Sequence, residues 1–392
     1  MRFQAAVWLA AAVPFLTTLA PPTSAQSPAD ATAPATRISG PFTHDNLAVY
    51  LVHGPSAPGP VPLTLGEAMA RGHAVVHETG NVNRLAIENT GSEEVFVQAG
   101  DIVKGGQQDR VLTISLLVPP RSGRIDIDAF CVEQGRWSAR GKEDVKRFAS
   151  AEMALPSREA KLAMMMPAKP SAAASPPMAV GSPSTAVGPL PDTSALQART
   201  RTMPARTLNG DYGDASSRQT QMWSSVATTQ RKLSDNVGSP VAAAQSASSL
   251  QLSLENTQLQ SARKSFMTSL ESAGTREADV VGYVFAVGGK LNSGDVYASN
   301  GLFAKMWKKQ LEAAVTEAIA EKSSGSVTAP PATAPTVGDV AAFIARAEGG
   351  KSAETLQPAN LVVRETRDAG SALLTETRKS AGGVLHRSYL AY

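Results

Sequence analysis

The sequence predicts an α+β fold, with a mainly antiparallel β-sheet core, several packed helices and disordered insertions rich in proline and alanine. Short β-branched and apolar runs, bounded by glycine, proline, asparagine and aspartate, fill the region from about residue 38 to 140. A helical spacing of apolar residues follows after residue 216. Tracts of low complexity interrupt the chain and account for many of its 26 prolines.

The first region is predicted to hold six strands and one short helix. Thr64 and Glu67 form a capping-box pattern that opens a helix over Leu65–Ala70. The predicted strands are Leu47–Val52, Ala74–Val76, Arg84–Glu88, Glu94–Gln98, Arg110–Val118 and Arg124–Glu133.

The second region is predicted to begin with helices and to end with strands. Two helical segments lie between Ser216 and Ser272, the second of them over Leu250–Leu270. An apolar strand over Val280–Val287 precedes an amphipathic helix over Leu302–Glu321, capped by Ser299 or Asn300. Thr336 opens a further helix that stops at Gly349 and Gly350. The closing strands are Leu361–Glu365, Ala372–Thr377 and Val384–Leu390.

Three tracts of proline, alanine and serine lack periodicity and hold few residues able to bury surface. They run over Ser27–Ala35, Pro156–Pro204 and Ser323–Pro335, and each is predicted to be disordered. We therefore expect a linker at 26–36 and a single domain over 37–392, interrupted by a disordered insertion at about 156–205.

The amino terminus predicts export. Met1 and Arg2 precede an apolar stretch over 5–20, and the small-residue site Thr23-Ser24-Ala25 follows it. A membrane anchor is the alternative, but the apolar run is about 16 residues and a spanning helix needs roughly 20. We expect a signal peptide over 1–25, a secreted or periplasmic protein, and no membrane span after signal cleavage.

The net charge and the cysteine count narrow the class of partner and the covalent links that the chain can form. Because the formal charge is only +3, no nucleic-acid partner is expected. Cys131 is the only cysteine, so the chain cannot form an intrachain disulfide. A buried thiol acting as a small hydrophobe is favoured for it, and a reactive thiol is the alternative.

Two motifs carry the candidate site: Gly100–Arg110, which contains Gly-Gly-Gln-Gln-Asp-Arg, and Cys131-Val-Glu-Gln-Gly-Arg-Trp137. A predicted hairpin joins them, with strands Arg110–Val118 and Arg124–Glu133. Pairing their apolar faces sets Val118 opposite Ile125, Leu112 opposite Cys131 and Arg110 opposite Glu133. Arg110 and Glu133 are therefore expected at one end of the sheet, on its inner side.

A guanidinium suits phosphate or carboxylate, and a partly buried carboxylate can act as acid or base. The expected ligand-binding residues are Gln107, Gln108, Asp109, Arg110, Glu133, Arg136 and Trp137. Glu133 and Asp109 are the catalytic candidates. The alternative is that Arg110 and Glu133 form a structural ion pair. No metal site and no cofactor are expected, because the five histidines lack metal spacing and no nucleotide-binding fingerprint is present.

At these two motifs the sequence resembles the ARG and Rhodanese-Phosphatase-superfamily-associated protein domain, a bacterial family of unknown function. The resemblance continues in Val281–Gly289, in Leu302–Leu311 and around His386. The family name implies association with ADP-ribosylglycohydrolase-type proteins, and hence with nucleotide, NAD or ADP-ribose metabolism. It supplies no reaction and no catalytic residue.

The function expected from all of this is the binding of a small polar or anionic ligand at the Arg110/Glu133 sheet end. A hydrolase acting on a ribosyl or phosphorylated substrate is the alternative, and a structural protein of the cell envelope is a second one. The sequence does not specify protein partners.

Overall fold

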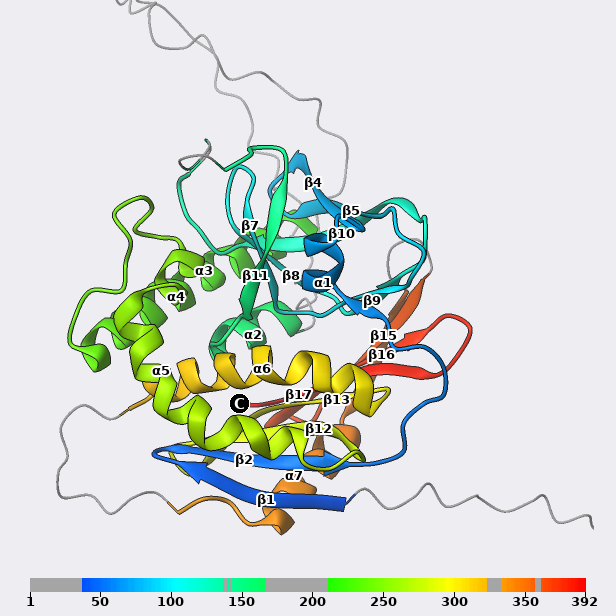
Figure 1. Ribbon diagram of the computed structural model, residues 1–392, viewed down its shortest axis with the longest axis vertical. Helices are drawn as coiled ribbons and strands as arrows, with labels where there is room; N and C mark the ends of the chain where they lie inside the picture. Colours follow the sequence, from blue (N-terminus) through cyan, green and yellow to red (C-terminus); the bar gives the residue numbers. More distant parts are fainter. Residues whose placement is uncertain are drawn as a thin grey trace, which may run out of the picture. The chain divides into compact units, whose positions relative to one another are not determined.

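The computed structural model describes residues 37–136, 138, 140, 143–166, 211–322, 333–356 and 361–392. The side chains of 211–215 and of Leu356 lie outside the description. The expected signal peptide, the linker and most of the long insertion also lie outside the described residues. The architecture is α+β, as the sequence predicts, with antiparallel sheets and helices packed against them (Figure 1).

The largest sheet is antiparallel and joins the beginning, middle and end of the described chain. Neighbouring strands in it come from distant sequence, since β2 pairs with β12 so that Tyr50 lies opposite Val284. In spatial order its strands are β1 (Arg37–His44), β2 (Leu47–His53), β12 (Val280–Val287), β13 (Lys290–Tyr297), β17 (Val384–Ala391), β16 (Ala372–Lys379), β15 (Val362–Asp368) and β14 (Lys351–Leu356).

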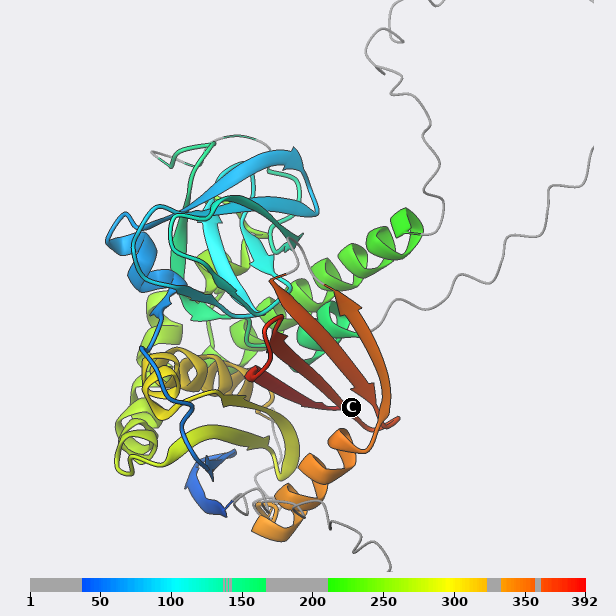
Figure 2. The same cartoon turned by 90° about the vertical axis from the view of Figure 1, so that its right-hand side faces the viewer.

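Both faces of this sheet are covered along β2 and β12, which explains why these two strands are buried along their whole length. Leu47, Val49 and Leu51 share one core cluster with the helix α6 (Asn300–Ala320). The alternating residues Ala48, Tyr50 and Val52 share another with α7 (Val337–Glu348), which lies on the opposite face (Figure 2). Because side chains alternate along a strand, the residues of β2 contribute to two separate cores, one on each face of the sheet.

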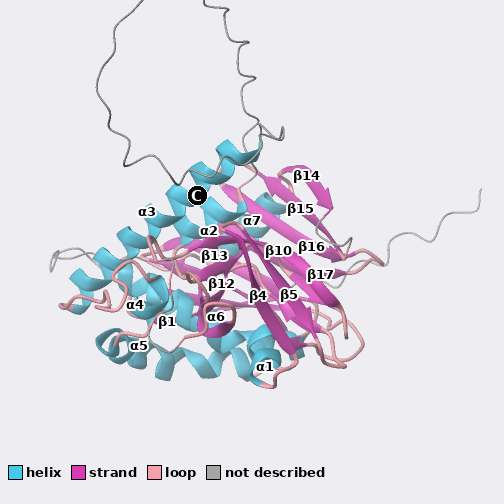
Figure 3. Ribbon diagram, turned by 90° about the horizontal axis from the view of Figure 1, so that it is seen from above, coloured by secondary structure: helices cyan, strands magenta, loops and turns pink. Residues whose placement is uncertain are grey.

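A second sheet has six strands and curls until its edges meet. Its order is β11 (Phe148–Ala154), β7 (Asp101–Gly105), β8 (Arg110–Leu112), β10 (Gly123–Cys131), β5 (Arg84–Asn89) and β4 (Ala74–Asn81). The closing contact is an antiparallel bridge between His77 of β4 and Arg147, which directly precedes β11. Apolar side chains, among them Val76, Leu85, Val103, Leu112 and Ile127, fill the interior. We call this element the closed sheet (Figure 3, where β4, β5 and β10 are labelled).

Smaller elements complete the fold. A three-stranded sheet consists of β3 (Leu63–Thr64), β6 (Val95–Val97) and β9 (Leu116–Val118), and α1 (Leu65–Ala70) continues directly from β3. The remaining helices are α2 (Arg158–Met165), α3 (Asp211–Val237), α4 (Leu250–Leu254), α5 (Thr257–Leu270) and the 3₁₀ helix η1 (Glu271–Thr275).

Local chemistry sets several boundaries as predicted. Thr64 and Glu67 form the expected capping box of α1, with the Thr64 N–H donating to Glu67 Oε2 at 2.8 Å. Ser299 caps α6, and α7 runs from the Thr336 cap to Gly349. The single predicted helix Leu250–Leu270 is instead two helices, because the Asn256 side chain accepts from the N–H groups of Gln258 and Leu259 and starts α5 anew.

The predicted hairpin between Arg110–Val118 and Arg124–Glu133 is wrong. The first strand divides into β8 and β9, and β9 pairs with β6 in the three-stranded sheet instead of with β10. The break falls at residues 113–115, where the Ser115 hydroxyl accepts the Ala99 N–H at 3.0 Å. The remaining pairing also has a different register, with Arg110 opposite Cys131 and Leu112 opposite Ala129.

The predicted disordered insertion begins too early. Ser157 accepts the Ala160 N–H and caps α2, whose Met164 and Met165 are buried in the main core. The low-complexity composition hid this helix because its apolar residues are mostly alanine and methionine. Strands β1, β3, β7, β11, β13 and β14 were also not predicted.

One glycine contact tests the packing of α6. A Cβ on Gly274 would lie 2.4 Å from Cε2 of the buried Trp307. Gly274→Ala should therefore lower the free energy of unfolding by about 1–3 kcal/mol through overpacking. Gly338→Ala is the matched control, because a Cβ there is 3.5 Å from its nearest neighbour and helix propensity favours alanine by up to about 1 kcal/mol. Equal unfolding midpoints in urea for both variants would contradict this packing.

Candidate functional site

Three polar side chains occupy one end of the interior of the closed sheet. Arg110 and Cys131 are directly opposed on β8 and β10. Arg110 lies two residues from Leu112, Cys131 two from Ala129, and Glu78 of β4 two from Val76. Since strand side chains alternate, all three share the inner face with those apolar residues. The closed sheet therefore has an apolar interior with a polar end.

Arg110 is fully buried and incompletely hydrogen-bonded. Its Nη1 donates to the Gln108 carbonyl at 2.9 Å. Its Nε and Nη2 have no hydrogen-bond partner within the described residues, and the nearest carboxylate oxygen, Oε2 of Glu78, is 3.8 Å from Nη2. Nε2 of Gln108 and Oε1 of Glu78 are likewise unpartnered in the described part of the chain. Buried polar groups without partners are costly, typically about 1–3 kcal/mol each.

The Cys131 thiol lies beside this arginine. It contacts Oε1 of Gln108 at 3.1 Å and is buried, as the sequence predicted. Burial raises its pKa to about 11, with Glu78 and Glu133 adding to the rise and Arg110 opposing it. The thiol is therefore protonated at neutral pH, which argues against the alternative of a reactive thiol.

The turns that cover the polar end are held by a second group of charges, which we call the clasp: Asp109, Glu133, Arg136 and Arg140. Arg140 contacts both oxygens of Asp109, at 2.9 and 3.1 Å, and lies 3.4 Å from Glu133. The Nε of Arg136 donates to Glu133 at 2.7 Å. Arg136 also donates to the carbonyls of Gly105 and Gly106 and so ties the two turns together.

Both carboxylates of the clasp are fully engaged. Asp109 accepts hydrogen bonds from the Gly105 N–H at 3.0 Å and from the Ser249 hydroxyl at 2.7 Å. Burial alone would raise the pKa of Glu133, but hydrogen bonds from Arg136, Ser246 and the Asp109 N–H lower it below its ordinary value. Glu133 is therefore ionised at neutral pH and holds no proton to donate as a general acid.

The structure thus divides the predicted site residues into two layers. Gln108 and Arg110 lie inside the closed sheet, and Asp109, Glu133 and Arg136 lie outside them in the clasp. The expected placement of Arg110 opposite Glu133 is wrong, because Arg110 pairs with Cys131 in the observed register. The alternative of an ion pair between them is also wrong, since Arg110 approaches Glu78 whereas Glu133 contacts Arg136 and Arg140. Gln107 is half-buried, and its N–H contacts Glu78 at 3.4 Å. Trp137 lies outside the described residues.

Three contributors gave no sequence signal. Glu78 comes from a strand more than 30 residues away, and Ser249 from the loop before α4. Gln219 of α3 uses its amide to accept the Cys131 N–H and to donate to the Cys131 carbonyl, both at 2.9 Å. A fourth contributor, Arg140, lies just after the Cys131–Trp137 motif. Its spacing of four residues from Arg136 could have indicated that it belongs to the same group of charges.

A second buried polar chain connects the sheets. The Ser115 hydroxyl lies 3.0 Å from Nδ1 of His386. Nε2 of His386 lies 3.1 Å from Oδ1 of Asp295, an ion-pair distance without hydrogen-bond geometry. Tyr283 donates to the other oxygen of Asp295, and the rings of Phe96 and Tyr297 flank the imidazole. Ser115 sits at the break between β8 and β9, whereas His386 and Asp295 belong to β17 and β13 of the large sheet.

The model of the ARG and Rhodanese-Phosphatase-superfamily-associated Protein domain matches residues 35–390, which is nearly the whole chain. No curated protein and no solved structure matches the chain. Among the described helices, none combines the length and the apolar character that a membrane crossing requires.

The clasp can be tested by removing one of its cations. Arg140→Met leaves Asp109 buried without its main counter-ion, and we expect a loss of about 3–5 kcal/mol in the free energy of unfolding. Lys104→Met is the matched control, because its 2.6 Å pair with Glu255 is partly exposed and is worth about 1 kcal/mol or less. Urea unfolding of both variants decides the point, and equal losses would contradict the assignment of Arg140 to the clasp.

Proposed function

The chain belongs to the ARG and Rhodanese-Phosphatase-superfamily-associated Protein domain family, and we propose that it is a binding module. Its ligand is a small polar or anionic group held by Arg110 inside the polar end of the closed sheet. The clasp keeps the covering turns in place and takes no direct part in binding.

The unpaired edge of the Arg110 guanidinium carries this proposal. Nε–H and one Nη2–H lie on the same edge of the planar group, and together they match the two oxygens of a carboxylate or phosphate. Both donors lack a partner within the described residues, and so does the amide nitrogen of Gln108. Three unpaired donors in a buried site favour an anionic acceptor.

Glu78 supplies the competing charge. Its carboxylate lies 3.8 Å from Nη2 of Arg110, too far for a hydrogen bond. The residues that follow it, Thr79 to Asn81, are exposed and lie at an irregularity in the pairing of β4 with β5. A ligand oxygen would replace this loose ion pair with two short hydrogen bonds, while Glu78 turns towards the exposed end of β4.

We further propose that the protein is exported, as its amino-terminal pattern indicates, so that its ligand is available outside the cytoplasm. This narrows the choice of ligand, because ATP is not supplied there. The mild formal charge of +3 supports a small ligand over a nucleic acid.

Hydrolysis is the second candidate, favoured by the chain Ser115–His386–Asp295. Asp109 and Glu133 suit it less, because the clasp engages both carboxylates. In this reaction the Ser115 oxygen would attack the electrophilic atom while its proton passes to His386, and His386 would give that proton to the departing group as its bond breaks. Water, deprotonated by His386, would then displace Ser115 from the bound group and restore the serine hydroxyl. We expect a fluorophosphonate probe to label wild-type protein at Ser115 and to leave Ser115→Ala unlabelled. Absence of labelling at Ser115 in the wild type would remove this candidate.

The role of Arg110 is tested by Arg110→Lys, which replaces the planar guanidinium with a single ammonium group. Inorganic phosphate, acetate and ADP-ribose are screened by thermal shift, and the affinity of any hit is measured by calorimetry. Because Lys cannot form the bidentate contact, Arg110→Lys should weaken binding by about ten- to a hundredfold. Removal of the competing charge in Glu78→Gln should strengthen it.

Arg124→Lys is the control, because Arg124 is exposed on the outer side of β10. It should bind like the wild type. Binding that is unchanged in Arg110→Lys, or a screen in which none of the three probes binds the wild type, would contradict the proposed site.

A further inference from the structure

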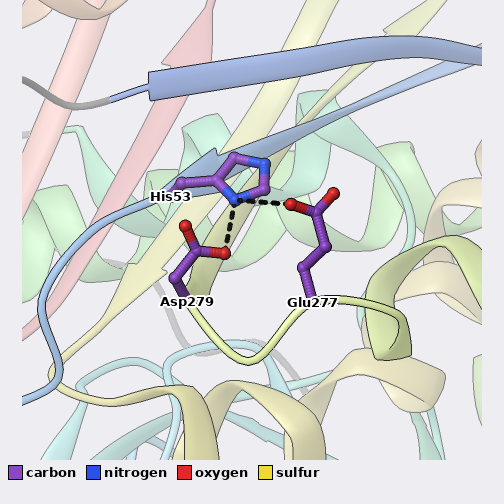
Figure 4. Close-up of side chains that lie close together, drawn as sticks. All are labelled: His53, Glu277 and Asp279. Carbon is purple, nitrogen blue, oxygen red and sulfur yellow. Dashed lines mark hydrogen bonds and ion pairs between the residues drawn. The ribbon is translucent and has the colours of Figure 1, made fainter.

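Three potential metal ligands meet where β2 of the large sheet ends, separate from the residues around Arg110 (Figure 4). His53 ends β2, and Glu277 and Asp279 lie in the segment between η1 and β12. The pairing of β2 with β12 sets His53 opposite Val280, and the Gly54 N–H donates to the Asp279 carbonyl at 2.9 Å. The ligand atoms of these three residues, which we call the His53 cluster, all lie within 4.8 Å of one another.

The imidazole of His53 is oriented by a hydrogen bond on its far side. Nε2 lies 2.8 Å from the Ser39 hydroxyl, and Nδ1 faces the two carboxylates. Metal-binding histidines are commonly held in this way, with one ring nitrogen fixed by a second group and the other directed at the cation. The ring itself is buried, so this orientation is firmly held.

Arg37 supplies a cation to the cluster, but it satisfies the acceptors poorly. Its Nη2 lies 2.7 Å from Nδ1 of His53, 2.7 Å from Oε2 of Glu277 and 3.2 Å from Oδ2 of Asp279. One amino group has two hydrogens, so it cannot serve three acceptors.

The protonation state of His53 does not remove this conflict. Nδ1 of His53 also lies 2.8 Å from Oδ1 of Asp279. If Nδ1 is unprotonated, its lone pair faces that oxygen. If it is protonated, it can donate to that oxygen but has no lone pair left for the Arg37 amino group 2.7 Å away. A single divalent cation would accept electron pairs from the nitrogen and both carboxylates at once.

We propose that the His53 cluster binds one divalent transition-metal cation in place of the Arg37 guanidinium. One imidazole nitrogen with two carboxylate oxygens suits Zn²⁺, with water filling the remaining position. Displacement of Arg37 costs little, because 52% of its side chain is exposed and exposed ion pairs contribute little. The metal would join the end of β2 to the segment that leads into β12, independently of the Arg110 site.

Sequence spacing did not indicate this site. The expectation of no metal site rested on the spacing among the histidines, whereas two of these ligands are carboxylates more than 220 residues from His53. Only the pairing of β2 with β12 brings them together.

The experiment measures Zn²⁺ binding by equilibrium dialysis and calorimetry at pH 7.5 on the full chain. Arg37→Gln removes the competing cation, so it should bind one Zn²⁺ per chain at this site at least several-fold more tightly than the wild type. Glu277→Gln/Asp279→Asn changes two half-exposed side chains and should retain the fold, as checked by circular dichroism, while weakening this binding by tenfold or more. Zn²⁺ should also raise the thermal midpoint of the wild type and not that of the double variant.

His77→Gln is the matched control, because His77 forms a comparable contact with Glu88, at 3.0 Å, elsewhere in the molecule. It should bind Zn²⁺ like the wild type. No binding by Arg37→Gln, undiminished binding by the double carboxylate variant, or an equal loss in His77→Gln would overturn the proposal. None of these outcomes depends on whether Arg110 binds an anion.

Discussion

Burial of the Arg110 guanidinium inside the closed sheet is the constraint on which the candidate site depends. A buried cation must be paired or must bind a ligand, since its desolvation is otherwise uncompensated. Here the neighbouring carboxylates are unequally placed. Asp109 and Glu133 form ion pairs with Arg136 and Arg140, and among the described residues Glu78 alone approaches Arg110, at 3.8 Å. The clasp thus closes the end of the sheet. Because its own arginines occupy Asp109 and Glu133, the N–H donors of Arg110 stay unused.

The closed sheet and the large sheet are joined by buried polar contacts as well as by apolar packing. Ser115, at the point where the chain passes from β8 to β9, contacts His386 of the large sheet. Because such contacts require a defined geometry, they fix how the closed sheet sits on β13 and β17 more narrowly than apolar packing would. The position of Arg110 therefore depends on strands from the far end of the chain.

Local patterns predicted the elements well where capping chemistry or a long apolar run was present. The Thr64–Glu67 capping box and the apolar strand Val280–Val287 match α1 and β12. The hairpin failed because facing apolar residues permit more than one register, and the choice was made by the Ser115 contacts and by pairing with β6. Motif residues correctly located the charged end of the sheet. Glu78 and Ser249 could not be predicted, since only tertiary structure brings them there.

The central claim is that Arg110 presents unused N–H donors to a ligand. Two-dimensional ¹H–¹⁵N spectra report each arginine Nε–H directly, and Arg110→Lys identifies the resonance by its loss. We predict that the Arg110 Nε–H exchanges slowly with water, as a buried group should, and that its chemical shift changes on saturation with an anion that raises the thermal midpoint. A resonance that exchanges rapidly, or that keeps its position at saturation, would contradict the account.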